Sequence, residues 1–238
     1  MSEPKTPSRT GSSEVARGTS SSSEVDAFLS KVQSLTPTVA GGGRLIFAMD
    51  ATMSRQPTWD LALGLQSEMF RAVKKVGGLD VQLMYFRGFG ECRASKWVRD
   101  PDALARLMRQ VHCEGGHTQI RKVLTHARKE TGRQTVNALV YVGDCMEENV
   151  DALCQLAGEL GLVGVPVFVF QEGHDARAEQ AFKEIARLSR GAYCRFDAGS
   201  VAQLRALLNA VAVYASGGRK ALENAKSGAA TLLLEQLR

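Results

Sequence analysis

The stretch RLIFAMDATMSRQ, residues 44–56, decides the fold of this 238-residue chain. Its first seven residues are mostly apolar, as in strands that are covered on both faces of a parallel sheet. The run ends on Asp50, and Thr52 and Ser54 follow at alternate positions. Because alternate side chains of an extended segment can point the same way, the pattern predicts three oxygen-bearing side chains gathered at a strand end.

Strand and helix patterns alternate from this stretch to residue 216. Helices are predicted in residues 58–78, 100–111, 149–161, 175–191 and 200–216, and a glycine-bearing loop leads into another helix within residues 112–132. Further strands are predicted in DVQLMYFRG, ECRASKWVRD, QTVNALVYVGD, VPVFVFQEG and AYCRFDA, of which ECRASKWVRD is polar enough for a sheet edge. This alternation indicates an α/β fold with a mostly parallel sheet and helices on both faces. Ligands of such sheets bind outside the carboxyl ends of the strands, so strand-end residues are the functional candidates.

Composition excludes several classes of protein. The net charge is +5, and the basic residues are scattered without a Lys/Arg-rich run, which argues against nucleic-acid binding. Five widely spaced cysteines without a CxxC pattern favour a reducing compartment over a disulfide framework. The N-terminus has no apolar signal region, and the longest apolar run, residues 160–170, is too short to cross a bilayer. We therefore expect a cytoplasmic protein without a membrane partner.

The chain divides into three parts. Residues 1–39 are rich in Ser, Thr, Gly and Pro over most of their length, which predicts a disordered or weakly helical segment. Residues 40–216 form the folded domain. Residues 217–238 carry apolar side chains near helical spacing, which predicts an amphipathic tail that packs on the domain, self-associates or contacts another protein.

Two further side chains join the strand-end candidates. Asp144 ends the fourth strand, and Thr118 follows EGGH, where a loop enters a helix. If the first and fourth strands are neighbours, Asp50 and Asp144 face one another at the edge of the sheet. Two carboxylates and three hydroxyls are hard oxygen donors of the kind that suits Mg²⁺.

These residues resemble the metal-ion-dependent adhesion site (MIDAS) of von Willebrand factor A (VWA) domains. The shared parts are D-x-[ST]-x-S at residues 50–54, a Thr in a later loop at Thr118, and an Asp ending the fourth strand at Asp144. The resemblance covers roughly residues 43–216 and is to the intracellular, bacterial type. It implies a Rossmann-like three-layer sandwich with a six-stranded sheet and one antiparallel edge strand.

The resemblance also implies a function. Thr52 and Ser54 would bind Mg²⁺ or Mn²⁺ directly, Thr118 would bind it in the ligand-bound arrangement, and Asp50 and Asp144 would act through bound water. A carboxylate of a partner protein would complete the coordination, as in a protein-binding module rather than an enzyme. Prokaryotic relatives often serve as adaptors to AAA-type ATPases or as assembly factors.

The sequence departs from the family pattern at several positions. Met53 stands where Gly is frequent, and its bulk would narrow access to the ion. CMEE follows Asp144 in place of the frequent Gly. Glu147, Glu148 and Glu172 are predicted near the same rim, where they would strengthen cation binding or repel an acidic partner.

Other interpretations stay open. Asp50 and Asp144 could cap loops or helices instead of serving a metal. A metal-free scaffold would keep the sheet and lose the site. A Mg²⁺-dependent phosphatase would use Asp50 as its nucleophile. Such enzymes generally need a second carboxylate two residues later for acid/base catalysis, where this chain has Thr52.

One loop and one single cysteine offer alternative metal ligands. HCEGGH offers His112, Cys113 and His117 as zinc ligands, but the spacing is not a recognised one and a loop with incidental histidines is favoured. Cys145 could place a thiol near the ion, although a small buried residue is the favoured interpretation.

Overall fold

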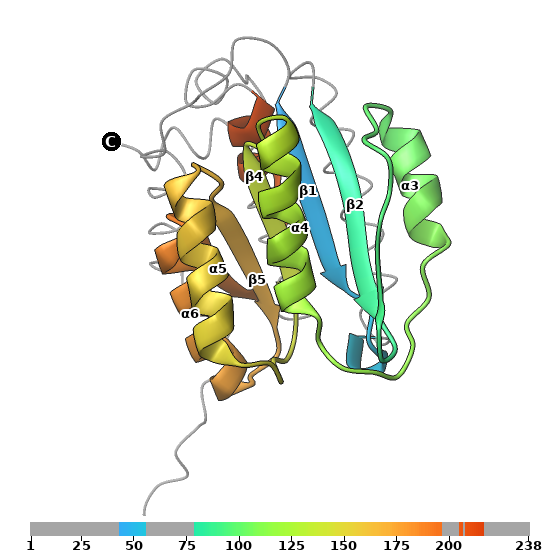
Figure 1. Ribbon diagram of the computed structural model, residues 1–238. Coiled ribbons are helices and arrows are strands. Elements are labelled where there is room, and N and C mark those ends of the chain that lie inside the picture. Colours follow the sequence, from blue (N-terminus) through green and yellow to red (C-terminus); the bar gives the residue numbers. More distant parts are fainter. Residues whose placement is uncertain (1–42, 56–78, 197–204, 207, 217–238) are drawn as a thin grey trace, which may run out of the picture.

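A six-stranded sheet forms the centre of the protein, whose computed structural model describes residues 43–55, 79–196, 205–206 and 208–216 (Figure 1). The strand order is β3-β2-β1-β4-β5-β6, and all neighbours are parallel except β2 and β3. The strands are β1 (Arg44–Asp50), β2 (Asp80–Arg87), β3 (Glu91–Ala94), β4 (Ala138–Gly143), β5 (Val167–Glu172) and β6 (Ala192–Phe196). The predicted fold class is confirmed, including the antiparallel strand at the edge.

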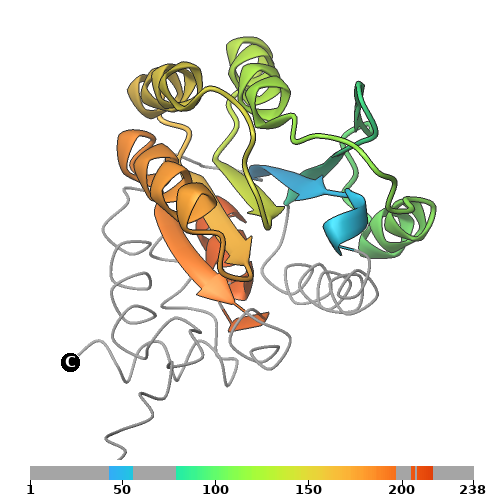
Figure 2. The ribbon, with the colours of Figure 1, turned by 90° about the horizontal axis from the view of Figure 1, so that it is seen from below.

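Helices cover both faces of the sheet, as Figures 1 and 2 show. The helices are η1 (Met53–Arg55), α3 (Pro101–Arg109), α4 (Ile120–Arg133), α5 (Val150–Leu162) and α6 (Ala176–Leu188), and residues 205–206 and 208–216 are also helical. One core unites the sheet with α4, α5 and α6, and the other unites it with α3 and residues 208–216. None of the described helices combines the length and apolar character that crossing a bilayer requires. The segments predicted in residues 1–39, 58–78 and 217–238 lie outside the described residues.

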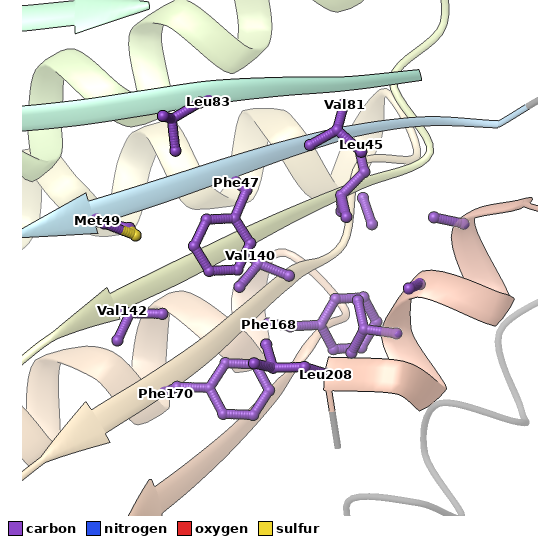
Figure 3. Close-up of a cluster of buried hydrophobic side chains, with 14 of the residues drawn as sticks. Leu45, Phe47, Met49, Val81, Leu83, Val140, Val142, Phe168, Phe170 and Leu208 are labelled. Carbon is purple, nitrogen blue, oxygen red and sulfur yellow. The ribbon is translucent and has the colours of Figure 1, made fainter. Parts of the chain in front are cut away.

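The alternation of side chains along β1 explains why residues 45–49 are all apolar. Leu45, Phe47 and Met49 enter the core on the α3 side, shown in Figure 3, whereas Ile46 and Ala48 enter the core under α4 and α5. Both faces of the strand are therefore covered, and every residue of β1 is buried.

Local capping fixes the starts of most helices. The Asp100 side chain accepts hydrogen bonds from the backbone of Asp102 and Ala103 before Pro101 opens α3. Asn149 and Asp175 cap α5 and α6 in the same way.

Helix α4 begins differently, because Gln119 makes no side-chain capping bond. Its first backbone N–H groups, those of Ile120 and Arg121, donate instead to the Glu148 carboxylate at 2.5 and 3.0 Å. The loop after β4 therefore holds the start of α4 and, with it, the preceding Thr118. The carboxyl ends of the parallel strands and η1 all lie at this edge, which is at the bottom of Figure 1 and faces the viewer in Figure 2.

Candidate metal centre

Asp50 and Asp144 lie together at the carboxyl edge of the sheet. Strands β1 and β4 are parallel neighbours, with Met49 paired to Val142, so the predicted adjacency is confirmed. One carboxylate oxygen from each aspartate and the Cys145 Sγ all lie within 4.8 Å of one another.

The two hydroxyls of the motif lie beside Asp50. The Thr52 backbone N–H donates to Asp50 Oδ1 at 2.8 Å, and the Thr52 side chain also hydrogen-bonds to Asp50. The hydroxyl oxygens of Thr52 and Ser54 lie 3.1 Å apart. Thr52 is buried and Ser54 is exposed, so the pair leads from Asp50 towards solvent.

Thr118 lies in the loop between α3 and α4, next to the other two segments of the site. Its backbone N–H donates to the Glu147 carboxylate at 3.0 Å, and its Oγ1 accepts from the Glu147 backbone N–H at 3.2 Å. Glu114, in the same loop, forms an isolated parallel β-bridge with Thr52, and its backbone N–H donates to the Ala51 carbonyl at 3.0 Å. The structure thus brings Asp50, Thr52, Ser54 and Asp144 together and anchors the Thr118 loop against them; the role of Thr118 as a ligand stays a prediction.

Three buried oxygens at this edge of the sheet make no hydrogen bond with any described residue. They are Asp50 Oδ2, Asp144 Oδ1 and the Tyr141 hydroxyl oxygen. A buried carboxylate oxygen without a partner carries a desolvation cost that a bound cation would offset. These residues therefore fit a divalent cation, and the oxygen donors suit Mg²⁺ or Mn²⁺.

The electrostatics of Asp50 agree with such a fit. The pKa of Asp50 is raised to about 7, because burial, aided by the charge of Asp144, outweighs the hydrogen bonds from Thr52 and the charge of Arg55, which lower it. A divalent cation would favour the ionised carboxylate and so reverse the effect of burial.

A buried arginine stands at the same edge. Arg55, at the end of η1, is 1% exposed and forms an ion pair with Glu172 at the end of β5. Burial lowers the pKa of Arg55, while the neighbouring charges of Asp144 and Asp50 support its ionised form. The site therefore already contains one positive charge near its two carboxylates.

The glutamates predicted near the rim have structural partners. Glu148 holds the start of α4, Glu147 contacts Thr118 and lies 3.2 Å from His117 Nδ1, and Glu172 pairs with Arg55. The predicted placement is correct for all three. The charges of Glu148 and Glu172 are partly compensated by a helix N-terminus and an arginine, which weakens the repulsion expected for an acidic partner.

The alternative zinc cluster does not form. Among the described residues, the one group of three His, Cys, Asp or Glu side chains within ligand distance is Asp50, Asp144 and Cys145, so His112, Cys113 and His117 do not converge. His117 packs edge-on against Phe89 instead, with ring centroids 5.2 Å apart. The described residues therefore offer no three-ligand zinc cluster in this loop.

Comparison with known proteins identifies the fold. No protein-family model matches the sequence, and no curated protein matches it. Solved structures do match, among them a von Willebrand factor type A protein from Catenulispora acidiphila, with 15% identity over 73% of this chain and 43% of that one and a TM-score of 0.58. The VWA domain of SpRpn10 matches with 12% identity over 74% of this chain and 97% of that one, at a TM-score of 0.55. The chain has the fold of a VWA domain.

A third match concerns a metal. Proximal thread matrix protein 1 from the mussel byssus, in a structure with a zinc-occupied MIDAS motif, shares 17% identity over 73% of this chain and 46% of its own, at a TM-score of 0.59. At these identities the likeness extends to the VWA fold alone. The chain spans less than half of this protein and of the Catenulispora protein.

Sequence reasoning missed two features of this VWA-fold edge. The sequence favours a small buried residue at Cys145, but this cysteine is half-buried and its thiol hydrogen-bonds to Asp144; its position next to Asp144 was the available signal. Arg55 carries no sequence signal of burial, because arginine is rarely buried and its partner Glu172 comes from a strand much later in the chain.

Proposed function

We propose that this VWA-fold protein is a metal-dependent protein-binding module. Asp50, Thr52, Ser54, Thr118 and Asp144 would hold Mg²⁺ or Mn²⁺, and the ion would capture a carboxylate of a partner protein. The observation that carries the proposal is that Asp50 and Asp144, near the Thr52 and Ser54 hydroxyls, each have one buried oxygen without a hydrogen-bond partner in the described part of the chain. When bound, the ion would supply a positive centre that attracts an anionic ligand.

The surroundings of the site support an acidic partner. Ser54 is exposed, which leaves the ion approachable from solvent. Met53 is 54% exposed, so more than half of its surface is in contact with solvent. Glu172 and Glu148 are engaged by Arg55 and by the start of α4, so less negative charge faces an approaching carboxylate.

Partner class and compartment follow as proposals. We place the protein in the cytoplasm, an assignment supported by its five cysteines, all of which are free thiols. An adaptor role beside an AAA-type ATPase follows from the MIDAS resemblance, with no nucleic-acid or membrane partner. The protein is proposed to have no hydrolase activity, and a generic phosphate ester should stay intact in its presence with Mg²⁺.

Affinity capture from native lysate tests the proposal directly. Wild type, Asp50→Ala and the surface control Glu184→Ala would be compared in Mg²⁺ and in EDTA, with melting curves to show that each variant is folded. A partner held by wild type and Glu184→Ala in Mg²⁺, and lost with Asp50→Ala or EDTA, is the expected result. A partner that survives both perturbations would refute metal-dependent capture.

A metal-free scaffold is the second candidate, favoured by one observation. Arg55 already places a positive charge near Asp50 and Asp144. Calorimetric titration with Mg²⁺ and Mn²⁺, repeated with the captured partner present, separates the two. Absence of binding in both titrations would select the scaffold.

A further inference from the structure

The strongest unassigned feature of the molecule is the thiol beside the two aspartates. Cys145 immediately follows Asp144 in the loop after β4, and its Sγ lies within 4.8 Å of a carboxylate oxygen of Asp144 and of Asp50. Two ligand atoms bound to one tetrahedral zinc ion lie roughly 3.3 to 3.8 Å apart, because each metal–ligand bond is about 2.0 to 2.3 Å long. The three atoms are therefore close enough to share one ion after small side-chain adjustments.

A second observation points to a ligand at this cluster. Asp50 is 0% exposed, and its Oδ2 accepts no hydrogen bond from any described residue; the same holds for the buried Asp144 Oδ1. Each of the two carboxylates grouped with the thiol therefore has one buried oxygen that finds no hydrogen-bond partner among the described residues. A cation among the three side chains would supply a partner to each.

We propose that Asp50, Asp144 and Cys145 together bind a zinc-class cation, so that this centre takes Zn²⁺ in preference to Mg²⁺. The inference rests on the proposed function and names the ion that its site prefers. Thiolate sulfur favours Zn²⁺, whereas Mg²⁺ requires oxygen ligands, so one cysteine is enough to change the selectivity of an otherwise oxygen-rich site.

The binding step is balanced in protons and charge. The Cys145 S–H loses its proton to solvent as the sulfur–metal bond forms, and the protonated fraction of Asp50, whose pKa is about 7, releases its proton in the same step. Thiolate and two carboxylates then carry three negative charges, of which the divalent ion offsets two.

Cobalt titration of the full chain tests the proposal, with Co²⁺ as the spectroscopic substitute for Zn²⁺. Wild type should bind one equivalent of Co²⁺ and develop a thiolate-to-cobalt charge-transfer band, which Zn²⁺ then abolishes by displacement. Cys145→Ser should lose the band and bind Zn²⁺ roughly tenfold or more weakly, while its Mg²⁺ affinity stays at the wild-type value. Cys113→Ser and Cys92→Ser are the matched controls and should keep the band.

The outcomes separate the two levels of the proposal. A wild-type protein without the band, or a Cys145→Ser variant that binds Zn²⁺ as tightly as wild type, overturns the zinc assignment and leaves the oxygen-ligand site standing. A protein in which Asp50→Asn changes the binding of neither Mg²⁺ nor Zn²⁺ overturns both. A band that disappears with Cys113→Ser rather than Cys145→Ser moves the thiol ligand elsewhere and also refutes the assignment.

Discussion

Arg55 and Glu172 form a buried ion pair at the carboxyl edge of the sheet. The arginine comes from the turn after β1 and the glutamate from the end of β5, and their side chains are 1% and 13% exposed. Asp144 and Asp50 contribute further negative charge around the guanidinium. The pair thus ties the metal-site turn to a strand that is not adjacent to β1 in the sheet.

Glu172→Gln should lower the free energy of unfolding by about 3 kcal/mol, because it removes a charge that compensates a buried guanidinium. The double variant Arg55→Met/Glu172→Gln should recover most of this loss, because it also removes the buried guanidinium charge that Glu172→Gln alone leaves uncompensated. Urea denaturation measures both. Glu184→Gln, which alters an exposed ion pair with Arg187, is the control and should change stability by less than about 1 kcal/mol. Equal effects of Glu172→Gln and Glu184→Gln would contradict the prediction.

Asp50→Asn should stabilise the metal-free protein above neutral pH. Burial raises the pKa of Asp50 from its ordinary 3.8 to about 7, so between these values the folded state holds a proton that the unfolded state has released. The wild-type protein in EDTA therefore loses stability as pH rises through this window, by up to about 4 kcal/mol at about 1.4 kcal/mol per pKa unit. The gain from the substitution should be full at about pH 8 and should vanish below about pH 4.

Denaturation in EDTA at several pH values checks this dependence. With added divalent metal, wild type should become more stable than Asp50→Asn at about pH 8, because the metal stabilises wild type and not the variant. If Asp50→Asn is less stable than metal-free wild type at about pH 8, the folded state does not raise the pKa of Asp50, and the prediction is wrong.

Gly116→Ala should displace the loop that carries Thr118. A Cβ at this position would lie 2.0 Å from the Gly88 carbonyl oxygen and 2.5 Å from its Cα, so loop and hairpin must separate. The expected cost is about 1 to 3 kcal/mol in stability, together with weaker binding of divalent metal. Denaturation and calorimetric titration measure the two effects.

Gly115→Ala is the matched control for this substitution. A Cβ at Gly115 meets no atom of the described chain within 4 Å, so stability should stay within about 0.5 kcal/mol of wild type. If both alanine variants keep the metal affinity of wild type, the placement of the Thr118 loop does not matter for the site.

Glu148→Gln should loosen the first turn of α4. The substitution removes the negative charge that accepts from the N–H groups of Ile120 and Arg121, at an expected cost of about 1 kcal/mol. Amide hydrogen exchange at these two residues should accelerate. Glu147→Gln, whose carboxylate accepts from Thr118 instead, should leave their exchange unchanged. Unchanged protection in Glu148→Gln would show that the helix start is held by other contacts.

Much of the fold was predictable because its signals are local. The buried run of β1, the capping Asp100 before Pro101 and the polar edge strand each follow from a few consecutive residues, and each lies where the sequence predicts. The spatial grouping of Asp50, Thr52 and Ser54 was predictable for the same reason, because all three lie at the end of one strand and in the turn that follows it.

The sequence by itself determined the α/β alternation and the oxygen-bearing strand ends, because side-chain period and turn chemistry act over short separations. Only the tertiary structure decided that β1 lies beside β4, which brings Asp144 to Asp50 from a distant part of the chain. It also decided the burial of Arg55 against Glu172, the capping of α4 by Glu148 and the approach of the Cys145 thiol. Each of these depends on charges and hydrogen bonds between segments that are distant in the sequence. These segments meet because burial of the apolar strands assembles the sheet.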